Sequence, residues 1–210
     1  MIVLSWNVRG LNSIPRQKVV RRLIESQSPD LVFIQETKLS LDGLANCVAC
    51  IWPQGSWQGV GALNFSGGMA CFWNPRKVSP LWWVSSRSAI SLVATSFETG
   101  ERCLLSNIYA PTDFTGKSQL WAHIRFIRSL DPFLPWIMAG DFNVVTSLDE
   151  KRGGMDQSSN LLRDMIGSLK LVDMEPINGV YTWTNQRCGD EDISERLDRF
   201  LVSCYWMNNK

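Results

Sequence analysis

The stretch Trp136-Ile137-Met138-Ala139-Gly140-Asp141-Phe142-Asn143 places a short apolar run directly before a carboxylate and an amide. A nearly all-apolar run of this length predicts a strand that is covered on both faces. If the extended conformation continues past the glycine, Asp141 and Asn143 point to the same side, because residues two apart share a face of a strand. A turn in which either side chain bonds its own backbone explains the same residues. This stretch alone leaves both interpretations open.

Four further motifs repeat this combination of a strand-like run and a polar side chain. They are Trp6-Asn7-Val8-Arg9-Gly10, Gln35-Glu36-Thr37, Asn107-Ile108-Tyr109-Ala110-Pro111 and Arg196-Leu197-Asp198-Arg199. The first two follow the apolar runs 2–6 and 31–35, and the segment between them opens a helix at Pro15 and ends it near Pro29. The chain is therefore predicted to begin with a strand, a helix and a second strand.

The remaining pattern predicts a mixture of strand-rich and helical segments. Strands are expected at 69–73, 89–97 and 102–109 as an antiparallel meander with a turn at 98–101, and further strands at 136–139, 180–184 and 196–202; helices are expected at 117–130 and 160–169, with a polar loop around 151–157. Because no linker or repeat interrupts the chain, the prediction is a single α/β domain over residues 1–210, with two sheets packed together and helices outside.

Composition limits the possible functions without choosing between them. The chain has 210 residues, 45% of them apolar, and ten Trp, which indicates a folded protein. A formal net charge of +1 excludes strong overall attraction to nucleic acid, although a local basic patch could still bind phosphate. No apolar run approaches the roughly 20 residues that span a bilayer, and the start lacks a basic leader. We therefore expect no membrane association and an intracellular protein, in the nucleus or the cytoplasm.

The polar residues of the motifs each have a structural and a chemical interpretation. Glu36 ends a strand, where a solvated carboxylate is common, but a Mg²⁺ ion also takes one or two carboxylates and completes its shell with water and phosphate. Asn7 ends the neighbouring strand and could lie beside it. Tyr109 could be an aromatic plug at a strand end. Asp198 lies in an otherwise apolar strand and needs a partner, because burying an unpaired carboxylate is unfavourable.

Together, the five motifs in this order resemble the endonuclease/exonuclease/phosphatase superfamily, which hydrolyses phosphodiesters with a divalent metal ion. The resemblance extends from Met1 to about Trp206 and implies a four-layer sandwich of two mixed β-sheets flanked by helices. It also implies roles for individual residues. These are Glu36 as the main ligand of Mg²⁺ or Mn²⁺ with Asn7 beside it, Asp141 orienting the attacking water, Asn143 and Tyr109 binding the phosphate, and Asp198 orienting a terminal histidine.

Within the superfamily, the sequence is most similar to the apurinic-endonuclease-like domain of plant non-LTR retrotransposons. The phrases that carry this are Trp6-Asn7-Val8-Arg9-Gly10-Leu11-Asn12, Gln35-Glu36-Thr37-Lys38, Gly67-Gly68-Met69-Ala70, Tyr181-Thr182-Trp183-Thr184-Asn185 and Arg196-Leu197-Asp198-Arg199-Phe200. The resemblance implies DNA as the partner, a nick that leaves a 3′-hydroxyl, and membership of a larger reverse-transcriptase polyprotein. Arg9 and Thr112 depart from the superfamily, since repair-type relatives usually have Asp and many relatives have Asn at these positions.

The superfamily ends in Ser-Asp-His on its last strand, and residues 1–210 contain no such sequence. We therefore expect a chain that is incomplete at its C-terminus, lacks the last strand and is impaired in hydrolysis. His123, the single histidine, lies in a predicted helix and receives no catalytic role.

Two alternatives stay open: a non-catalytic remnant that binds DNA or protein, and a small-molecule phosphoesterase. A nuclease should place several basic side chains around Glu36 and Asp141, whereas a phosphatase should have a closed pocket. The candidates for such contacts with a phosphate backbone are Arg16, Lys18, Lys38, Arg152, Arg187 and Arg199.

Overall fold

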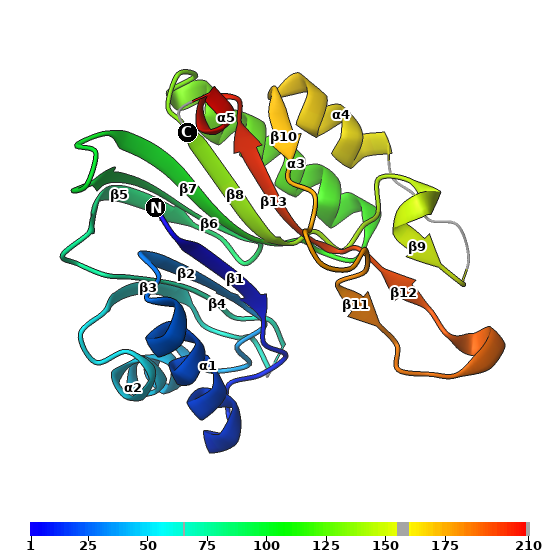
Figure 1. Ribbon diagram of the computed structural model, residues 1–210, viewed down its shortest axis with the longest axis horizontal. Coiled ribbons are helices and arrows are strands. Elements are labelled where there is room, and N and C mark those ends of the chain that lie inside the picture. Colours follow the sequence, from blue (N-terminus) through cyan, green and yellow to red (C-terminus); the bar gives the residue numbers. More distant parts are fainter. Residues whose placement is uncertain (65, 155–159, 209–210) are drawn as a thin grey trace. The chain divides into compact units, whose positions relative to one another are not determined.

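The computed structural model describes residues 1–64, 66–154 and 160–208. Contacts between residues divide the chain into two compact units (Figure 1). The N-terminal unit is Met1–Tyr109 with Met138–Gly140, and the C-terminal unit is Ala110–Ile137 with Asp141–Lys210. The expectation of a single domain stays a prediction. The fold class is confirmed: the strands form two large mixed sheets, and helices flank them.

The first sheet lies wholly in the N-terminal unit and has the strand order β1-β2-β4-β3. Its strands are β1 (Val3–Asn7), β2 (Leu31–Gln35), β3 (Ser56–Val60) and β4 (Met69–Trp73). The first two strands are parallel and in register, so that Asn7 pairs with Gln35. Strand β4 runs antiparallel to both β2 and β3. Two motif residues thus end neighbouring parallel strands.

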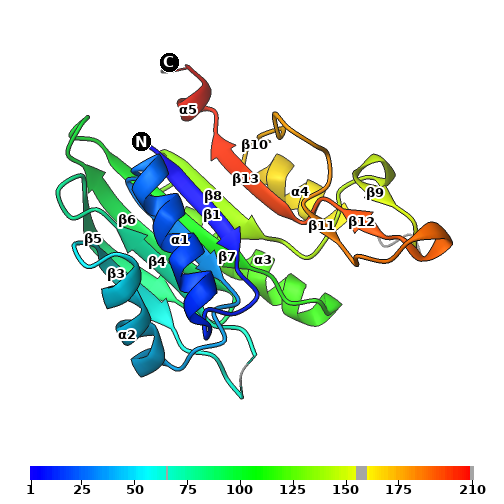
Figure 2. The same ribbon diagram turned by 60° about the horizontal axis from the view of Figure 1, so that its bottom comes forward.

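Helices α1 (Ile14–Gln27) and α2 (Leu41–Ile51) lie side by side over one face of this sheet (Figures 1 and 2). Pro15 stands in the first turn of α1, where a missing backbone N–H has no consequence. The Ser40 side chain caps α2 by accepting a hydrogen bond from the Gly43 amide at 3.1 Å. Both helices bury apolar residues in one cluster with the sheet, which includes Val20, Ile24, Leu44, Val48, Ile34 and Phe72.

The second sheet has the strand order β10-β13-β8-β7-β6-β5. Its strands are β5 (Val78–Ser85), β6 (Ala89–Ser96), β7 (Arg102–Tyr109), β8 (Trp136–Asp141), β10 (Leu171–Asp173) and β13 (Asp198–Ser203). The expected meander was wrong in one strand. Strand β4 belongs to the first sheet, and β5, which the sequence pattern did not indicate, pairs antiparallel with β6, as β6 does with β7.

The C-terminal unit contains the other helices and a small third sheet of order β11-β12-β9. Its elements are α3 (Phe114–Leu130), α4 (Asn160–Ser168), α5 (Tyr205–Asn208), the 3₁₀ turns η1 (Leu148–Glu150) and η2 (Gly189–Glu191), and strands β9 (Lys151–Arg152), β11 (Trp183–Thr184) and β12 (Ser194–Glu195). Asp113 caps α3 by accepting from the Gly116 amide at 2.8 Å, so the helix begins before the predicted Lys117. The Trp121 ring of α3 stacks on Phe142 at 6.1 Å.

Two further expectations differ in extent from the structure. The predicted strand 180–184 is reduced to β11, and the predicted loop 151–157 begins with β9 and ends at residues 155–157, which lie outside the described residues. Among the helices that the structure describes, none has the length and apolar character needed to cross a membrane.

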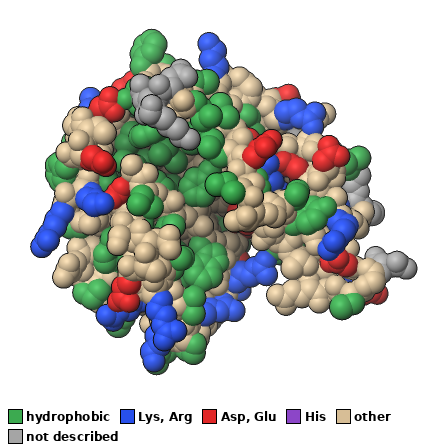
Figure 3. Space-filling model, viewed as in Figure 1, with side chains coloured by type: hydrophobic (Ala, Val, Ile, Leu, Met, Phe, Trp, Pro, Cys, Tyr) green, Lys and Arg blue, Asp and Glu red, His purple; other side chains and the backbone are tan. Residues whose placement is uncertain are grey.

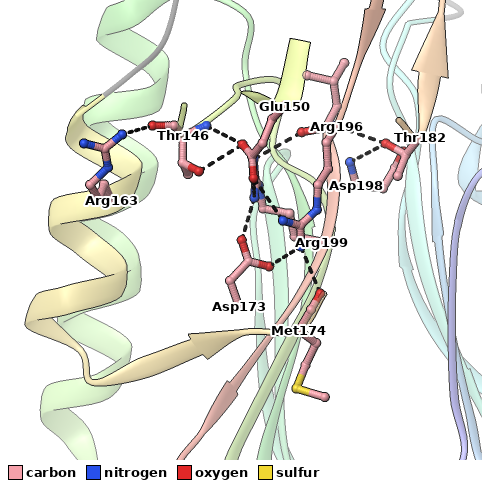
Figure 4. A network of polar contacts seen from close by, with 10 residues as sticks. Thr146, Glu150, Arg163, Asp173, Met174, Thr182, Arg196, Asp198 and Arg199 are labelled. Atoms are coloured by element: carbon pink, nitrogen blue, oxygen red, sulfur yellow. Dashed lines mark hydrogen bonds and ion pairs between the residues drawn. The ribbon is translucent and has the colours of Figure 1, made fainter. Parts of the chain in front are cut away.

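A buried network of four charged side chains holds the C-terminal unit together (Figure 4). Arg196 donates to Glu150 at 2.9 Å and to Asp173 at 2.6 Å. Arg199, only 2% exposed, also donates to both carboxylates, with Nη1 at 2.8 Å from Glu150 Oε1 and at 2.5 Å from Asp173 Oδ2. Each guanidinium therefore bridges the same two acids, which joins η1, β10 and the start of β13.

Burial alone would raise the pKa of Glu150, but hydrogen bonds and charge act in the opposite direction and are larger in sum. The hydrogen bonds come from Arg199 and from the backbone and hydroxyl of Thr146, and together with the Arg199 charge they lower the pKa from 4.5 to about 2. A depressed carboxyl pKa stabilises the fold at pH values above the unfolded pKa, and this contribution is lost as the pH falls through the folded value. Acidification from about pH 4.5 toward 2 should therefore weaken the network.

We predict that Glu150→Gln lowers the free energy of unfolding by about 3–5 kcal/mol, because both arginines lose a buried charged partner. The variant should also lose part of the decline in stability between pH 4.5 and 2 that the parent shows. Urea denaturation at several pH values measures both effects. Glu175→Gln, an exposed change in the same unit, is the matched control. Equal costs for the two variants would show that the network contributes nothing specific.

Candidate active site

In the N-terminal unit, the backbone ties Asn7 and Glu36 together at the ends of β1 and β2. The Val8 amide donates to the Gln35 carbonyl at 3.1 Å, and the Gly10 amide donates to the Glu36 carbonyl at 2.7 Å. A third bond follows from Leu11 to Thr37 at 2.8 Å. The two segments therefore stay paired beyond the strands, and the carboxylate and the amide arise from adjacent strand ends.

The backbone of Glu36 is in the left-handed region, with φ of 56°, which is unusual for a residue with a side chain. A glycine loop opposite holds it there: the Thr37 amide donates to Gly68 at 3.0 Å and the Lys38 amide to Gly67 at 2.9 Å. Gly68 has φ of +84°, and a Cβ atom there would lie 2.3 Å from the Thr37 hydroxyl. Strained conformations of this kind cost about 1–3 kcal/mol and cluster at functional sites. The Gly67-Gly68 pair is therefore needed for the close approach of this loop to Thr37 and Lys38.

The donor set around Glu36 suits a divalent cation that keeps most of its water. Glu36 pairs with Lys38 Nζ at 3.0 Å, and the Asn7 side-chain oxygen accepts from the Arg9 amide at 3.1 Å. One carboxylate with a neighbouring amide oxygen matches the sparse protein coordination that Mg²⁺ accepts. Within the described ranges, no group of three or more His, Cys, Asp or Glu side chains could hold a metal ion. The residues present therefore fit a weakly held ion, and Lys38 would have to move from Glu36 to admit it.

A pair of fully buried amide side chains fixes the position of Tyr109 in the same unit. Gln35 Nε2 donates to Asn107 Oδ1 at 2.6 Å, and Asn107 Nδ2 donates to the carbonyls of Ile34 and Ala70 at 3.2 and 2.9 Å. Asn107 therefore joins β7 to β2 and β4 of the first sheet. Tyr109 follows two residues later at the end of β7. Gln35 and Asn107 both stand within the motifs, but the sequence pattern indicated no role for either.

In the C-terminal unit, Asp141 ends β8 and is 6% exposed. Its Oδ1 accepts from the Asn143 amide at 2.9 Å, and Asn143 has φ of 49°. The chain therefore turns here, which is the alternative in which the Asp side chain bonds its own backbone, and the extended conformation does not continue to Asn143. Both residues nevertheless meet at Ala110, because the Ala110 amide donates to the Asp141 carbonyl at 2.8 Å and Asn143 Nδ2 donates to the Ala110 carbonyl at 2.7 Å.

Asp198 begins β13, and its position depends on Thr182 (Figure 4). The Thr182 hydroxyl oxygen accepts from the backbone amides of both Leu197 and Asp198, at 3.0 and 2.9 Å. Sequence reasoning did not single out Thr182, although it stands inside the Tyr181–Asn185 phrase. His123 lies in α3, and its buried Nε2 finds no hydrogen-bond partner among the residues that the structure describes.

The basic side chains expected to contact phosphates are mostly engaged within their own units. Arg199 is buried in the ion network, so its assignment to a phosphate-contacting surface was wrong. Arg16 instead donates to the carbonyls of Val8, Arg9 and Gly10 and holds the loop that follows Asn7. The others pair with local acids or are exposed: Arg152 with Asp192, Arg187 with Glu191, Lys38 with Glu36, and Lys18 on the surface of α1. On the face shown in Figure 3, Lys and Arg side chains lie on the surface together with Asp and Glu side chains.

Comparison with known proteins places these residues in a family context. The family described as Endonuclease/Exonuclease/phosphatase matches residues 4–203. The exodeoxyribonuclease of Bacillus subtilis (strain 168) is 24% identical over 229 residues, which cover 97% of this chain and 88% of that protein. The resemblance found in the motifs is therefore confirmed.

Two solved structures show the same fold. The 3′ phosphatase NExo from Neisseria, bound to a product DNA hairpin, has a TM-score of 0.75 at 22% identity and covers 97% of this chain and 86% of its own. The endonuclease domain of TRAS1, a telomere-specific non-LTR retrotransposon, has a TM-score of 0.72 at 16% identity and covers 98% and 86%. At these sequence identities, the structural similarity establishes the fold alone.

We predict that Asn107→Ala destabilises the protein by about 1–3 kcal/mol or more, because the buried Gln35 amide loses its bond to Asn107 and keeps only the one to Ser5, and the carbonyls of Ile34 and Ala70 lose the Asn107 donor. Asn46→Ala, an exposed change in α2, is the control and should stay within about 0.5 kcal/mol. Chemical denaturation monitored by tryptophan fluorescence compares the two. If Asn107→Ala lowers the free energy of unfolding no more than Asn46→Ala does, the buried amide pair does not stabilise the fold.

Proposed function

Because the chain belongs to the endonuclease/exonuclease/phosphatase family, we propose that it hydrolyses phosphodiester bonds of DNA as the endonuclease domain of a non-LTR retrotransposon. The observation that carries this proposal is the setting of Glu36, at a strand end beside Asn7 and in a constrained left-handed backbone. The retrotransposon origin rests on the sequence phrases around Asn7, Glu36 and Asp198. The same phrases suggest that a reverse transcriptase accompanies this domain in a larger polyprotein.

Members of this family generally depend on a divalent metal ion. We assign Glu36 as the ligand of Mg²⁺ or Mn²⁺, with the Asn7 amide oxygen beside it. When bound, the metal neutralises charge on the phosphate and assists the departing oxygen. Lys38 forms an ion pair with Glu36, and metal binding requires that this ion pair open.

The proposed reaction forms a bond between a water oxygen and phosphorus and breaks the bond from phosphorus to the 3′-oxygen, leaving a 3′-hydroxyl. Asp141 orients the water, and its carboxylate is held by the turn to Asn143. The Asn143 amide nitrogen carries two hydrogens; one bonds Ala110, and the other is assigned to a phosphate oxygen. The Tyr109 hydroxyl is assigned a hydrogen bond to the substrate phosphate, as the resemblance implies.

Asp198 is assigned the orientation of a general acid–base group. In the superfamily that the motifs resemble, this group is the histidine of a Ser-Asp-His sequence on the last strand. Residues 1–210 contain a single histidine, His123, which lies in α3. A positioned acid–base group contributes typically about 10²–10⁴ in rate. The polypeptide of residues 1–210 should therefore cleave DNA slowly or not at all.

Two other functions compete with this proposal. A non-catalytic remnant would bind DNA or a protein without cleaving it. A small-molecule phosphoesterase would need a pocket at the candidate residues. A groove of about 440 Å³ in the N-terminal unit is lined by residues at the ends of α1 and α2, such as Arg21 and Trp52, and by Lys77 from the turn between β4 and β5. None of the candidate residues lines it. This groove gives the phosphoesterase no support.

The metal assignment predicts that Glu36→Gln lowers the affinity for Mn²⁺ by about tenfold or more, since even the loss of groups that orient metal ligands costs 10–100-fold. Affinity of the parent should already be weak, because few protein groups contribute. Titration followed by electron paramagnetic resonance measures the free ion directly. Glu25→Gln, an exposed change on α1, is the control. Equal affinities of the parent and Glu36→Gln would exclude Glu36 as the ligand.

The activity assignment is tested by plasmid nicking with two polypeptides, residues 1–210 and the same chain extended by a relative's last strand with Ser-Asp-His. We expect the extended chain to nick about 10²–10⁴ times faster. Asp141→Asn in the extended chain should abolish most of that activity. Equal rates for the two parents would show that the histidine is not needed. Binding of DNA by both without nicking would favour the non-catalytic remnant.

A further inference from the structure

The basic side chains of the C-terminal unit are largely neutralised by acids of the same unit. The ion pairs are Arg196 and Arg199 with Glu150 and Asp173, Lys151 with Glu195, Arg152 with Asp192, and Arg187 with Glu191. Lys117 is different. Within residues 110–154 and 160–208, no carboxylate pairs with its ammonium, which donates to the neutral carbonyl of Thr112 at 3.1 Å. Its positive charge is therefore anchored but not cancelled by direct contact.

The anchor places Lys117 next to the Gly-Asp-Phe-Asn motif. Thr112 lies two residues after Ala110, whose amide donates to the Asp141 carbonyl at 2.8 Å and whose carbonyl accepts from Asn143 Nδ2 at 2.7 Å. The segment 110–112 therefore bonds Asp141 and Asn143 through the backbone of Ala110 and Lys117 through the carbonyl of Thr112. Lys117 itself belongs to α3, which the packing of Trp121 on Phe142 fixes to the same motif.

The electrostatic setting of Lys117 suits an anionic ligand. Burial lowers the pKa of its ammonium, and the charges of Asp113, Asp141 and Glu195 act in the opposite direction. The group is thus partly desolvated while it lies within electrostatic range of Asp141. Its printed hydrogen bond goes to a neutral carbonyl, and none of the nearby carboxylates in the described part of this unit pairs with it directly, so a phosphate oxygen would be a charged acceptor in direct contact. The side chain is half-buried, so a ligand can still reach it.

We propose that Lys117 is a phosphate-binding residue, which donates to a non-bridging oxygen of the DNA backbone beside Asp141 and Asn143. The inference rests on the proposed function and adds a substrate contact that the motifs did not indicate. Lysine suits this task because its ammonium is a compact charge with three donors, of which the Thr112 carbonyl takes one. The contact reads the backbone and not the bases, so it should act on any sequence.

The test is the salt dependence of duplex-DNA binding, measured by fluorescence anisotropy in EDTA so that neither metal nor cleavage contributes. Removal of one phosphate contact should reduce the slope of log Kobs against log [salt] by about 0.9. We expect this reduction for Lys117→Gln and a retained slope for Lys117→Arg, which keeps the charge. Arg125→Gln is the matched control: it removes one charge from the exposed surface of α3, about 12 Å further along the helix. This control should leave the slope unchanged.

The outcomes separate this inference from the proposed function. Equal slopes for Lys117→Gln and the parent, or equal losses for Lys117→Gln and Arg125→Gln, overturn the role of Lys117 while DNA binding stands. A parent chain that does not bind duplex DNA overturns the proposed function and this inference with it. Thermal melting shows whether each variant is folded. Should Lys117→Gln unfold, Lys117→Met, which keeps the buried aliphatic chain, replaces it with the same expected loss of slope.

Discussion

The hydrogen bond between the buried side chains of Gln35 and Asn107 is the constraint on which the N-terminal unit depends. It joins the two strands that lead to Glu36 and Tyr109, and Asn107 uses its remaining donors on the carbonyls of Ile34 and Ala70. A buried amide network of this kind has few satisfactory geometries, because each unpaired group in a low-dielectric interior is expensive. It therefore fixes how β7 lies against the first sheet more closely than apolar packing would. Glu36 directly follows β2, and Tyr109 is the last residue of β7.

In the C-terminal unit, ion pairs position the strand that carries a candidate residue. Glu150, Asp173, Arg196 and Arg199 come from segments far apart in the chain, up to 49 residues in one pair, and each guanidinium bridges both acids. Buried ion pairs contribute little net stability compared with apolar packing, but they tolerate few alternative arrangements. Their consequence here is the placement of β13, whose first residue is Asp198. Thr182 then completes the positioning through two backbone hydrogen bonds.

The sequence predicted the strands that lead to the motifs, because short apolar runs ending at polar residues have a clear signature. It did not indicate α2 or β5. Helix α2 carries Gly43 and apolar residues on most of its surface, so no polar face marks its period. Strand β5 contains Pro80 and a bulge and exposes Leu81 and its tryptophans, which hides the alternation of a sheet edge. Among the site residues, the local pattern allowed the turn at Asn143 as one of two interpretations, because the Asp141 carboxylate that makes it is two residues away. It could not show that Arg199 is buried, because the carboxylates that pair with Arg199 are distant in sequence.

Four of the eight positive φ angles that the described residues show outside glycine lie in or next to the motifs. Arg9, Glu36, Lys38 and Asn143 all adopt them, with φ between 49° and 56°. Each costs stability relative to an ordinary conformation, and glycine would relieve the cost at once. At Glu36, Lys38 and Asn143 the side chain that would then be lost is a carboxylate, its ammonium partner, and an amide held against Ala110. Strained conformations of this kind cluster at functional sites, so these angles support the proposal that the motifs form a site, although charged and amide side chains outside the motifs, such as Lys170 and Asn64, adopt them as well.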